Sequence, residues 1–316
     1  MNNGHNAAII ILAARIPLLE KVLNKLYFNW NINFNYPLYI HTFGKLISEK
    51  KQQEIKKKFK NQIFFCEVNP AYPDHIPEKE LYYNRTYLNY VNKAFPKKRS
   101  GYLHMCYFKT NITKFGNKGC LDVRLQKYDK LMFYDDDNEL KVKIDYDLFD
   151  LSSDYPIVTG FLTKRSGDQE MKDVTENLWL FYSKFIKDNN INPKNKILRD
   201  AIKTDDSNAI YDLAYTSGAF EIFNLKLINN NFWNLYLDQA NKFGGNYKYR
   251  WGDMQVTNLF VRTFFEKPIL NLDLIQKEIL NNKIDGSDQF IYFNNTDVYN
   301  SILFKYIVKL KKFIFS

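Results

Sequence analysis

The chain has 316 residues, with 45 Lys and Arg against 35 Asp and Glu, so its formal net charge is +10 at pH 7. Apolar residues make up 45% and charged residues 25%, which excludes a disordered chain, a collagen-like repeat and a coiled coil. A chain of this length can bury roughly three quarters of its unfolded surface. Since no repeat or low-complexity linker divides it, we expect one compact domain.

The cysteines and the N-terminal apolar run indicate in which cellular compartment the chain is expected. Three cysteines, Cys66, Cys106 and Cys120, are too few for a disulfide framework, so we expect buried free thiols. No Cys-x-x-Cys pair or His/Cys cluster occurs in the sequence, which argues against a structural zinc site. The N-terminal apolar run, Ala7–Ala14, is shorter than the roughly 20 residues that cross a bilayer. We therefore expect no signal peptide or transmembrane segment, and a cytoplasmic chain or one peripheral to a membrane.

The first predicted elements alternate between strand and helix. A buried strand, an amphipathic helix, a second strand, a solvated helix and a third strand are predicted at Ala7–Ala14, Ile16–Leu26, Tyr36–Phe43, Ser48–Lys60 and Ile63–Val68. This order is typical of a parallel sheet with helical crossovers. Such sheets bind ligands beyond the carboxyl ends of their strands.

The remainder predicts a mixture of both kinds of element. Helices are expected at Glu78 to about Asn92, Val174 to about Lys187, Phe232 to Phe243 and Trp251 to Phe265, and strands at Leu131–Tyr134 and Pro156–Phe161.

An acidic cluster directly follows one predicted strand. In Leu131–Asp137, an apolar strand runs into three aspartates. Asp135 and Asp137, one residue apart, can jointly hold a hard divalent cation that bridges a diphosphate. Such a metal offsets the charge on a nucleoside diphosphate leaving group. A solvated turn is the alternative.

Two further acids stand in unusual places. Glu221 lies in the apolar segment Ser217–Ile222, where an unpaired carboxylate is costly to bury. It indicates either a functional site or a residue paired to an Arg or Lys. Asp253 ends an aromatic Arg-Trp-Gly-Asp segment at a predicted helix start, where the segment by itself favours an N-cap over a functional residue.

Taken together, these segments resemble the fungal α-1,2-mannosyltransferases, the glycolipid 2-α-mannosyltransferase family, from about Ala8 to Phe265. Gly101–Cys106 is similar to the family's Tyr-Arg-His-Met-Cys segment, and Tyr128–Asp137 to the segment ending in Glu-Pro-Asp. Phe220–Ile222 matches Asn-Phe-Glu-Ile. Phe232–Asp253 matches the block that ends in Arg-Trp-Gly-Asp, the most specific of the four.

This resemblance implies a single-domain α/β protein of the GT-A glycosyltransferase fold, with a Rossmann-like central mixed sheet flanked by helices. It implies a retaining enzyme that uses Mn²⁺, or equally Mg²⁺. The sugar moved would be mannose from GDP-mannose, in an α-1,2 linkage to a glycan or glycoprotein acceptor.

Site residues follow from the same resemblance. Asp135 and Asp137 take the metal and diphosphate role. Glu221 becomes the carboxylate beneath the sugar, as nucleophile or stabiliser of an oxocarbenium-like state, and Asp253 takes an acceptor-side or sugar-hydroxyl role. Contacts to the donor are implied for Tyr102, at the sugar nucleotide, and for Arg15, at the guanine nucleotide.

The chain also departs from the family. Leu103 and Tyr107 stand where the family has arginines, and Leu270–Lys277 lacks the family's metal-binding histidine. The four histidines are at positions 5, 41, 75 and 104. Metal binding would therefore depend on Asp135, Asp137 and water, and a UDP-sugar donor stays an alternative.

A binding protein on a decayed transferase fold is the alternative from another class. The +10 charge and the basic stretch Lys97–Arg99 favour an anionic membrane or a nucleic acid as its ligand. The enzyme ranks first because a binding protein does not need all of the site acids, and we expect no nucleic-acid partner.

The C-terminal segment is set apart from the catalytic domain, which we expect to span residues 1–298. In the tail, residues 299–316, apolar and aromatic side chains share one helical face and Lys305, Lys309 and Lys312 lie towards the other. This pattern fits a basic helix on an anionic membrane surface or, equally, a last core helix.

Overall fold

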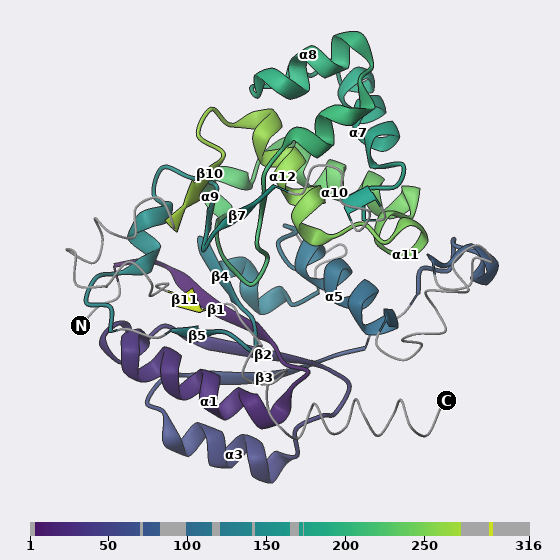
Figure 1. Ribbon diagram of the computed structural model, residues 1–316. Coiled ribbons are helices and arrows are strands. Elements are labelled where there is room, and N and C mark those ends of the chain that lie inside the picture. Colours follow the sequence, from purple (N-terminus) through teal and green to yellow (C-terminus); the bar gives the residue numbers. More distant parts are fainter. Residues whose placement is uncertain are drawn as a thin grey trace, which may run out of the picture.

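A seven-stranded sheet forms the centre of the molecule (Figure 1). The computed structural model describes residues 4–69, 72–82, 99–115, 121–140, 143–164, 171–172, 174–272 and 291–292. The order across the sheet is β10 (Ile269–Asn271), β6 (Ile157–Thr159), β9 (Phe220–Asn224), β4 (Lys130–Tyr134), β1 (Ala7–Leu12), β2 (Leu38–Phe43) and β3 (Ile63–Val68). Two small antiparallel pairs join β5 (Glu139–Leu140) to β11 (Ile291–Tyr292) and β7 (Leu162–Thr163) to β8 (Tyr215–Thr216).

Strand direction changes at β9. Strands β3, β2, β1 and β4 are parallel, as predicted for the first three, whereas β9 runs antiparallel to both β4 and β6. The amino end of β9 therefore lies at the carboxyl end of β4. There Tyr134 pairs with Phe220, and the N–H of Asp135 donates to the carbonyl of Ala219 at 3.0 Å. The predicted mixed α/β sheet is confirmed.

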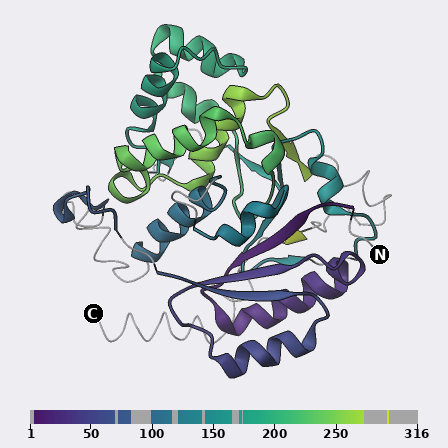
Figure 2. The same cartoon turned by 180° about the vertical axis from the view of Figure 1, so that it is seen from behind.

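Helices cover both faces of the sheet (Figures 1 and 2). One face carries α1 (Ile16–Leu26) and α3 (Glu49–Lys58), and the other carries α5 (Arg99–Asn111), α7 (Leu178–Asp188), α10 (Asn231–Phe243) and α12 (Asp253–Phe264). Shorter or more distant helices are α2 (Ile32–Phe34), α8 (Lys196–Thr204), α9 (Leu225–Ile228) and α11 (Gly245–Tyr249). A π-helical turn, Tyr27–Asn31, continues α1, and 3₁₀ turns lie at Glu78–Glu80, Val123–Lys127, Leu148–Ser152 and Ser207–Asp212.

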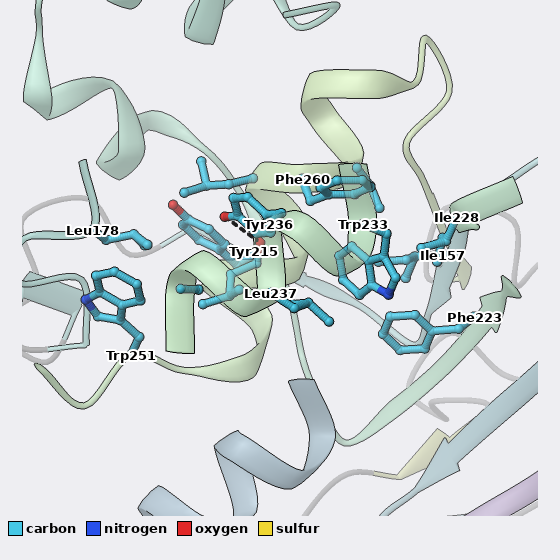
Figure 3. Close-up of a cluster of buried hydrophobic side chains, with 14 of the residues drawn as sticks. Ile157, Leu178, Tyr215, Phe223, Ile228, Trp233, Tyr236, Leu237, Trp251 and Phe260 are labelled. Carbon is cyan, nitrogen blue, oxygen red and sulfur yellow. Dashed lines mark hydrogen bonds between the residues drawn. The ribbon is translucent and has the colours of Figure 1, made fainter. Parts of the chain in front are cut away.

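Strand β1 is buried on both faces, which explains its unbroken apolar sequence. Ile9 and Ile11 belong to the core cluster that contains Leu19 and Leu23 of α1. Ala8 and Ile10 belong to the cluster on the other face, with the aromatic residues of α7, α10 and α12. Alternate side chains of a strand point to opposite faces, so both faces of β1 have to be apolar. Figure 3 shows part of the second cluster, in which Trp233, Tyr236 and Phe260 pack together.

Local sequence signals predicted the bounds of α1 and the end of α10. Helix α1 has the predicted bounds, whereas α3 is shorter than predicted and ends at Lys58. Ser48 is the N-cap of α3 and accepts a hydrogen bond from the N–H of Lys51 at 3.3 Å. Helix α10 ends at Gly244, whose φ of +94° lies in the left-handed region that glycine adopts at little cost.

Other predicted helices differ from the structure. The helix expected from Glu78 is a single 3₁₀ turn, after which Leu81 is extended, and positions 83–92 lie outside the described residues. Helix α7 begins at Leu178 because positions 174–177 form a turn, and α12 begins at Asp253, two residues after the predicted start. Helices α5 and α8 were not predicted.

Two predictions concern the thiols and the membrane. Cys66 and Cys106 are buried free thiols, as expected, whereas Cys120 lies outside the described residues. No helix in the described part of the chain has the length and apolar character needed to span a bilayer. The tail, residues 299–316, and the side chains at 97–99 are likewise not described, so the domain boundary at 298 stays a prediction.

Candidate active site

The acidic turn, Asp135–Asp137, follows β4 and is held by its middle residue. Asp136 is 1% exposed and accepts hydrogen bonds from the N–H groups of Ala14 and Arg15, both at 2.6 Å, and from Nε of Arg15 at 2.7 Å. Nη1 of Arg15 also lies 2.6 Å from Oδ2 of Asp137. Asp136 therefore has a structural role, tying the turn to the loop after β1. Arg15, predicted to contact the nucleotide, pairs with the turn instead, and its nucleotide contact stays a prediction.

Lys109 of α5 supplies a second cation to the same turn. Its side chain is 6% exposed, and Nζ donates to Oδ1 of Asp135 and to the carbonyl of Gly218, each at 2.7 Å. Burial lowers the pKa of Lys109, but the charges of Asp135 and Asp253 outweigh burial and the net shift is upward. The ammonium is therefore charged at neutral pH.

Glu221 lies inside the sheet, next to the acidic turn. It is 2% exposed, pairs with Phe133 of β4 and Thr159 of β6, and its Oε1 has no hydrogen-bond partner. Burial and then the Asp253 carboxylate raise the pKa of Glu221 to about 7. Among the described residues it forms no ion pair, since Lys109 acts on it only through space. A structural ion pair therefore does not explain this carboxylate.

Asp253 is the first residue of α12, not its N-cap. Gly252 precedes the helix without a side-chain cap, and Asp253 is 4% exposed. Burial raises the pKa of Asp253, Lys109 opposes that effect, and the net shift is upward. A carboxylate at a helix amino end is stabilised by the helix dipole, so Asp253 can still hold charge there. Asp253 therefore lies at the amino end of α12 and is also coupled electrostatically to Lys109 and Asp135.

Tyr102 lies in the lining of a pocket of about 310 Å³ that also includes Thr216, Ser217 and Met254. These last three residues are close neighbours in sequence of the candidate catalytic acids. The guanidinium of Arg250 stacks over the Tyr102 ring at 4.9 Å. The volume lies at the low end of the range for small-molecule sites, roughly 300–1,000 Å³.

A divalent cation fits the acidic turn by charge and by ligand type. The acids Asp135, Asp136, Asp137, Glu221 and Asp253 outnumber the cations Arg15 and Lys109. Lys109 uses Oδ1 of Asp135, which leaves Oδ2 for a metal, and carboxylate oxygens are the ligands that Mg²⁺ and Mn²⁺ prefer.

The histidines have partners elsewhere. His5 contacts Asp150, His41 contacts Asp122, His75 contacts the carbonyl of Asn241, and His104 contacts the hydroxyl of Tyr247. That the metal has no histidine ligand stays a prediction.

One group of potential metal ligands was not visible in the sequence. His41, Cys66 and Asp122 bring their ligand atoms within 4.8 Å of one another, although no sequence spacing joins them. Arg124 already supplies a cation there, with Nη2 at 2.7 Å from Cys66 Sγ and from Asp122 Oδ2. The Arg124 guanidinium thus already contacts two of the three atoms that a metal would bind.

Sequence reasoning thus found the acids but missed Lys109 and the structural role of Asp136. A signal for Lys109 existed. Tyr102, Cys106 and Lys109 are spaced by four and three residues, which places them on one face once α5 is recognised as a helix.

Comparison with known proteins agrees with this geometry. A family model described as glycolipid 2-alpha-mannosyltransferase matches residues 2–274. The probable mannosyltransferase MNT3 of Candida albicans (strain SC5314 / ATCC MYA-2876) is 28% identical over 201 residues, 62% of this chain and 48% of that protein. The chain thus spans about half the length of this relative.

Two solved structures share the fold. The mannosyltransferase Ktr4p from S. cerevisiae in complex with GDP matches with a TM-score of 0.67 at 21% identity, over 84% of this chain and 68% of that chain. The Mn/GDP form of core-mannan synthase A (CmsA/Ktr4) from Aspergillus fumigatus matches with a TM-score of 0.67 at 19% identity, over 84% and 72%.

A mixed sheet with helices on both faces, and acids gathered at the carboxyl end of β4, give the architecture of the GT-A fold. The chain belongs to the glycolipid 2-alpha-mannosyltransferase family.

Proposed function

We propose that the protein is a retaining, metal-dependent mannosyltransferase. It takes mannose from GDP-mannose and forms an α-1,2 linkage on a glycan or glycoprotein acceptor. Family membership supports this proposal, and so does one observation above all. Glu221 is a buried carboxylate, and one of its oxygens has no hydrogen-bond partner. It interacts electrostatically with Asp253 and lies near the carboxyl end of β4, where the acidic turn begins.

Each residue has a proposed part in the reaction. Asp135 and Asp137 would hold Mn²⁺ or Mg²⁺, which when bound offsets charge on the departing nucleoside diphosphate. Arg15 keeps the acidic turn in place through Asp136. The Glu221 carboxylate either attacks the anomeric carbon of the donor sugar or stabilises the oxocarbenium-like state that forms there. Asp253 orients a sugar hydroxyl, and Tyr102 lines the pocket for the sugar.

A decayed binding protein is less well supported. Asp135, Glu221 and Asp253 are coupled electrostatically through Lys109, and two of them are buried. Burying several carboxylates is costly and gives a binding protein no benefit, whereas a catalytic site needs groups of perturbed pKa. The retained site therefore favours the enzyme.

Donor hydrolysis tests the proposed function. We expect GDP-mannose to be hydrolysed, and transferred to mannoside acceptors, only with Mn²⁺ or Mg²⁺ present. GDP-glucose and UDP-sugars at the same concentration should give much lower rates. A faster rate with a UDP-sugar would change the donor assignment. No turnover of any nucleotide sugar, with or without metal, would favour the binding protein.

Membrane association is proposed for the tail, residues 299–316. Three lysines opposite an apolar face gain about 1 kcal/mol each near an anionic leaflet. The full chain should therefore sediment with anionic but not neutral vesicles and be released as salt rises. A chain ending at residue 298 should stay in solution and keep its activity on a soluble acceptor. An insoluble truncated chain, together with no vesicle binding by the intact one, would instead make the tail a core helix.

A further inference from the structure

A buried ammonium group lies at the centre of the candidate site. Lys109 is 6% exposed, which is rare for lysine unless it is paired. Nζ has two partners, Oδ1 of Asp135 and the carbonyl of Gly218, each at 2.7 Å. An ammonium has three hydrogens, so these two partners leave one donor for a further group.

Lys109 also joins three separate parts of the site. It projects from α5, Asp135 follows β4, and Gly218 lies in the turn between β8 and β9. Gly218 has φ of +71°, and a Cβ built on it would lie 3.0 Å from Met254 and 3.7 Å from Oδ2 of Asp253. The turn that Lys109 holds is therefore packed against the acid at the start of α12.

The electrostatic surroundings of Lys109 are negative. Asp135, Asp253 and Glu221 all act on its charge, and the first of these is a proposed metal ligand. At such short range and in a partly buried site, one fixed positive charge changes the binding of other ions strongly. It favours an anion and disfavours a second cation.

We propose that Lys109 is a resident cation of the donor site that supports diphosphate binding together with the divalent metal. The inference rests on the proposed function. The ammonium holds Asp135 by one oxygen, leaves the other oxygen for the metal, and adds a positive charge that needs no metal to be present. Lys109 thus competes with the metal for the charge of Asp135 and is a source of affinity for the nucleoside diphosphate.

This role predicts effects of opposite sign on two ligands. Lys109→Met keeps most of the unbranched side chain but removes the charge. GDP binding to the full chain in EDTA should weaken about tenfold. Mn²⁺ binding without nucleotide should become several-fold tighter, because Asp135 loses its competing cation. Both affinities are measured by titration calorimetry.

Two control variants sharpen the test. Lys109→Arg keeps the charge and should restore most of the GDP affinity in EDTA. Lys114→Met removes another lysine that is 6% exposed and ion-paired, to Asp238 at 2.5 Å, in the segment that follows α5. It should change neither affinity.

Each outcome is decisive. A loss of both affinities in Lys109→Met would show a structural role only, and unchanged affinities would show no role; either overturns the inference. If the wild type binds GDP and Lys109→Met changes neither the GDP nor the Mn²⁺ affinity, the inference fails but the proposed function stands. Wild-type protein that binds neither GDP nor Mn²⁺ overturns both.

Discussion

Glu221→Gln should lower kcat by about 10³-fold or more while the affinity for GDP stays close to that of the wild type. The carboxylate lies inside the sheet, where we propose that it acts on the sugar, whereas the proposed site for GDP is the acidic turn. Glutamine has almost the same shape, so a loss of turnover reports the loss of the charge. Single-turnover transfer and GDP titration measure the two effects separately.

The same variant should differ from the wild type in the pH dependence of its stability. The pKa of Glu221 is raised to about 7 in the folded protein, so folding favours the protonated form. Its contribution to stability is full below the ordinary pKa of about 4.5 and is lost as pH rises through about 7. The loss amounts to up to about 3 kcal/mol at pH 8. Glu221→Gln should not show it, and so should be more stable than the wild type at pH 8.

A matched control is Glu67→Gln, because Glu67 is an exposed glutamate in strand β3 of the same sheet. It should alter neither turnover nor the pH profile of the melting temperature. If Glu221→Gln melts well below the wild type at pH 8 and keeps its turnover, the carboxylate is structural and the catalytic assignment is wrong.

Asp135→Asn and Asp137→Asn should each lower turnover by about 10²-fold or more at saturating Mn²⁺, because asparagine is a neutral and weaker ligand for a hard cation. Asp137→Asn should leave the melting temperature nearly unchanged. Asp135→Asn should reduce it moderately, because the buried ammonium of Lys109 loses its charged partner. Initial rates across a Mn²⁺ series, with thermal melts of each variant, give both readouts.

Asp136→Asn provides the contrast within the same turn. Asp136 is 1% exposed and accepts hydrogen bonds from two N–H groups and one guanidinium. Its replacement should cost about 1–3 kcal/mol of folding free energy. The turnover of the protein that remains folded should depend on Mn²⁺ as in the wild type. Near-normal turnover of Asp135→Asn or Asp137→Asn would remove the metal assignment, whatever the behaviour of Asp136→Asn.

The sequence by itself determined the elements whose signal is local. These elements are the apolar run of β1, the amphipathic α1 and the Gly244 end of α10. They depend on neighbouring residues and on helix or strand periodicity. The resemblance of short motifs further identified the family. It also singled out Asp135, Asp137, Glu221 and Asp253 as candidate site acids. These conclusions needed no knowledge of which strands pair.

The tertiary structure decided how those acids are used. Strand β9 is antiparallel to β4, and this pairing brings Glu221 next to the end of β4. The order of the elements in the sequence does not show that these two strands are neighbours. Lys109 meets its partners across 26 and 109 residues of sequence, and Arg15 meets Asp136 across 121. Ion pairs and burial depend on where distant segments come together, and residue spacing carries no record of that. For this reason the sequence identified the carboxylates of the site, and only the fold showed which cations hold them.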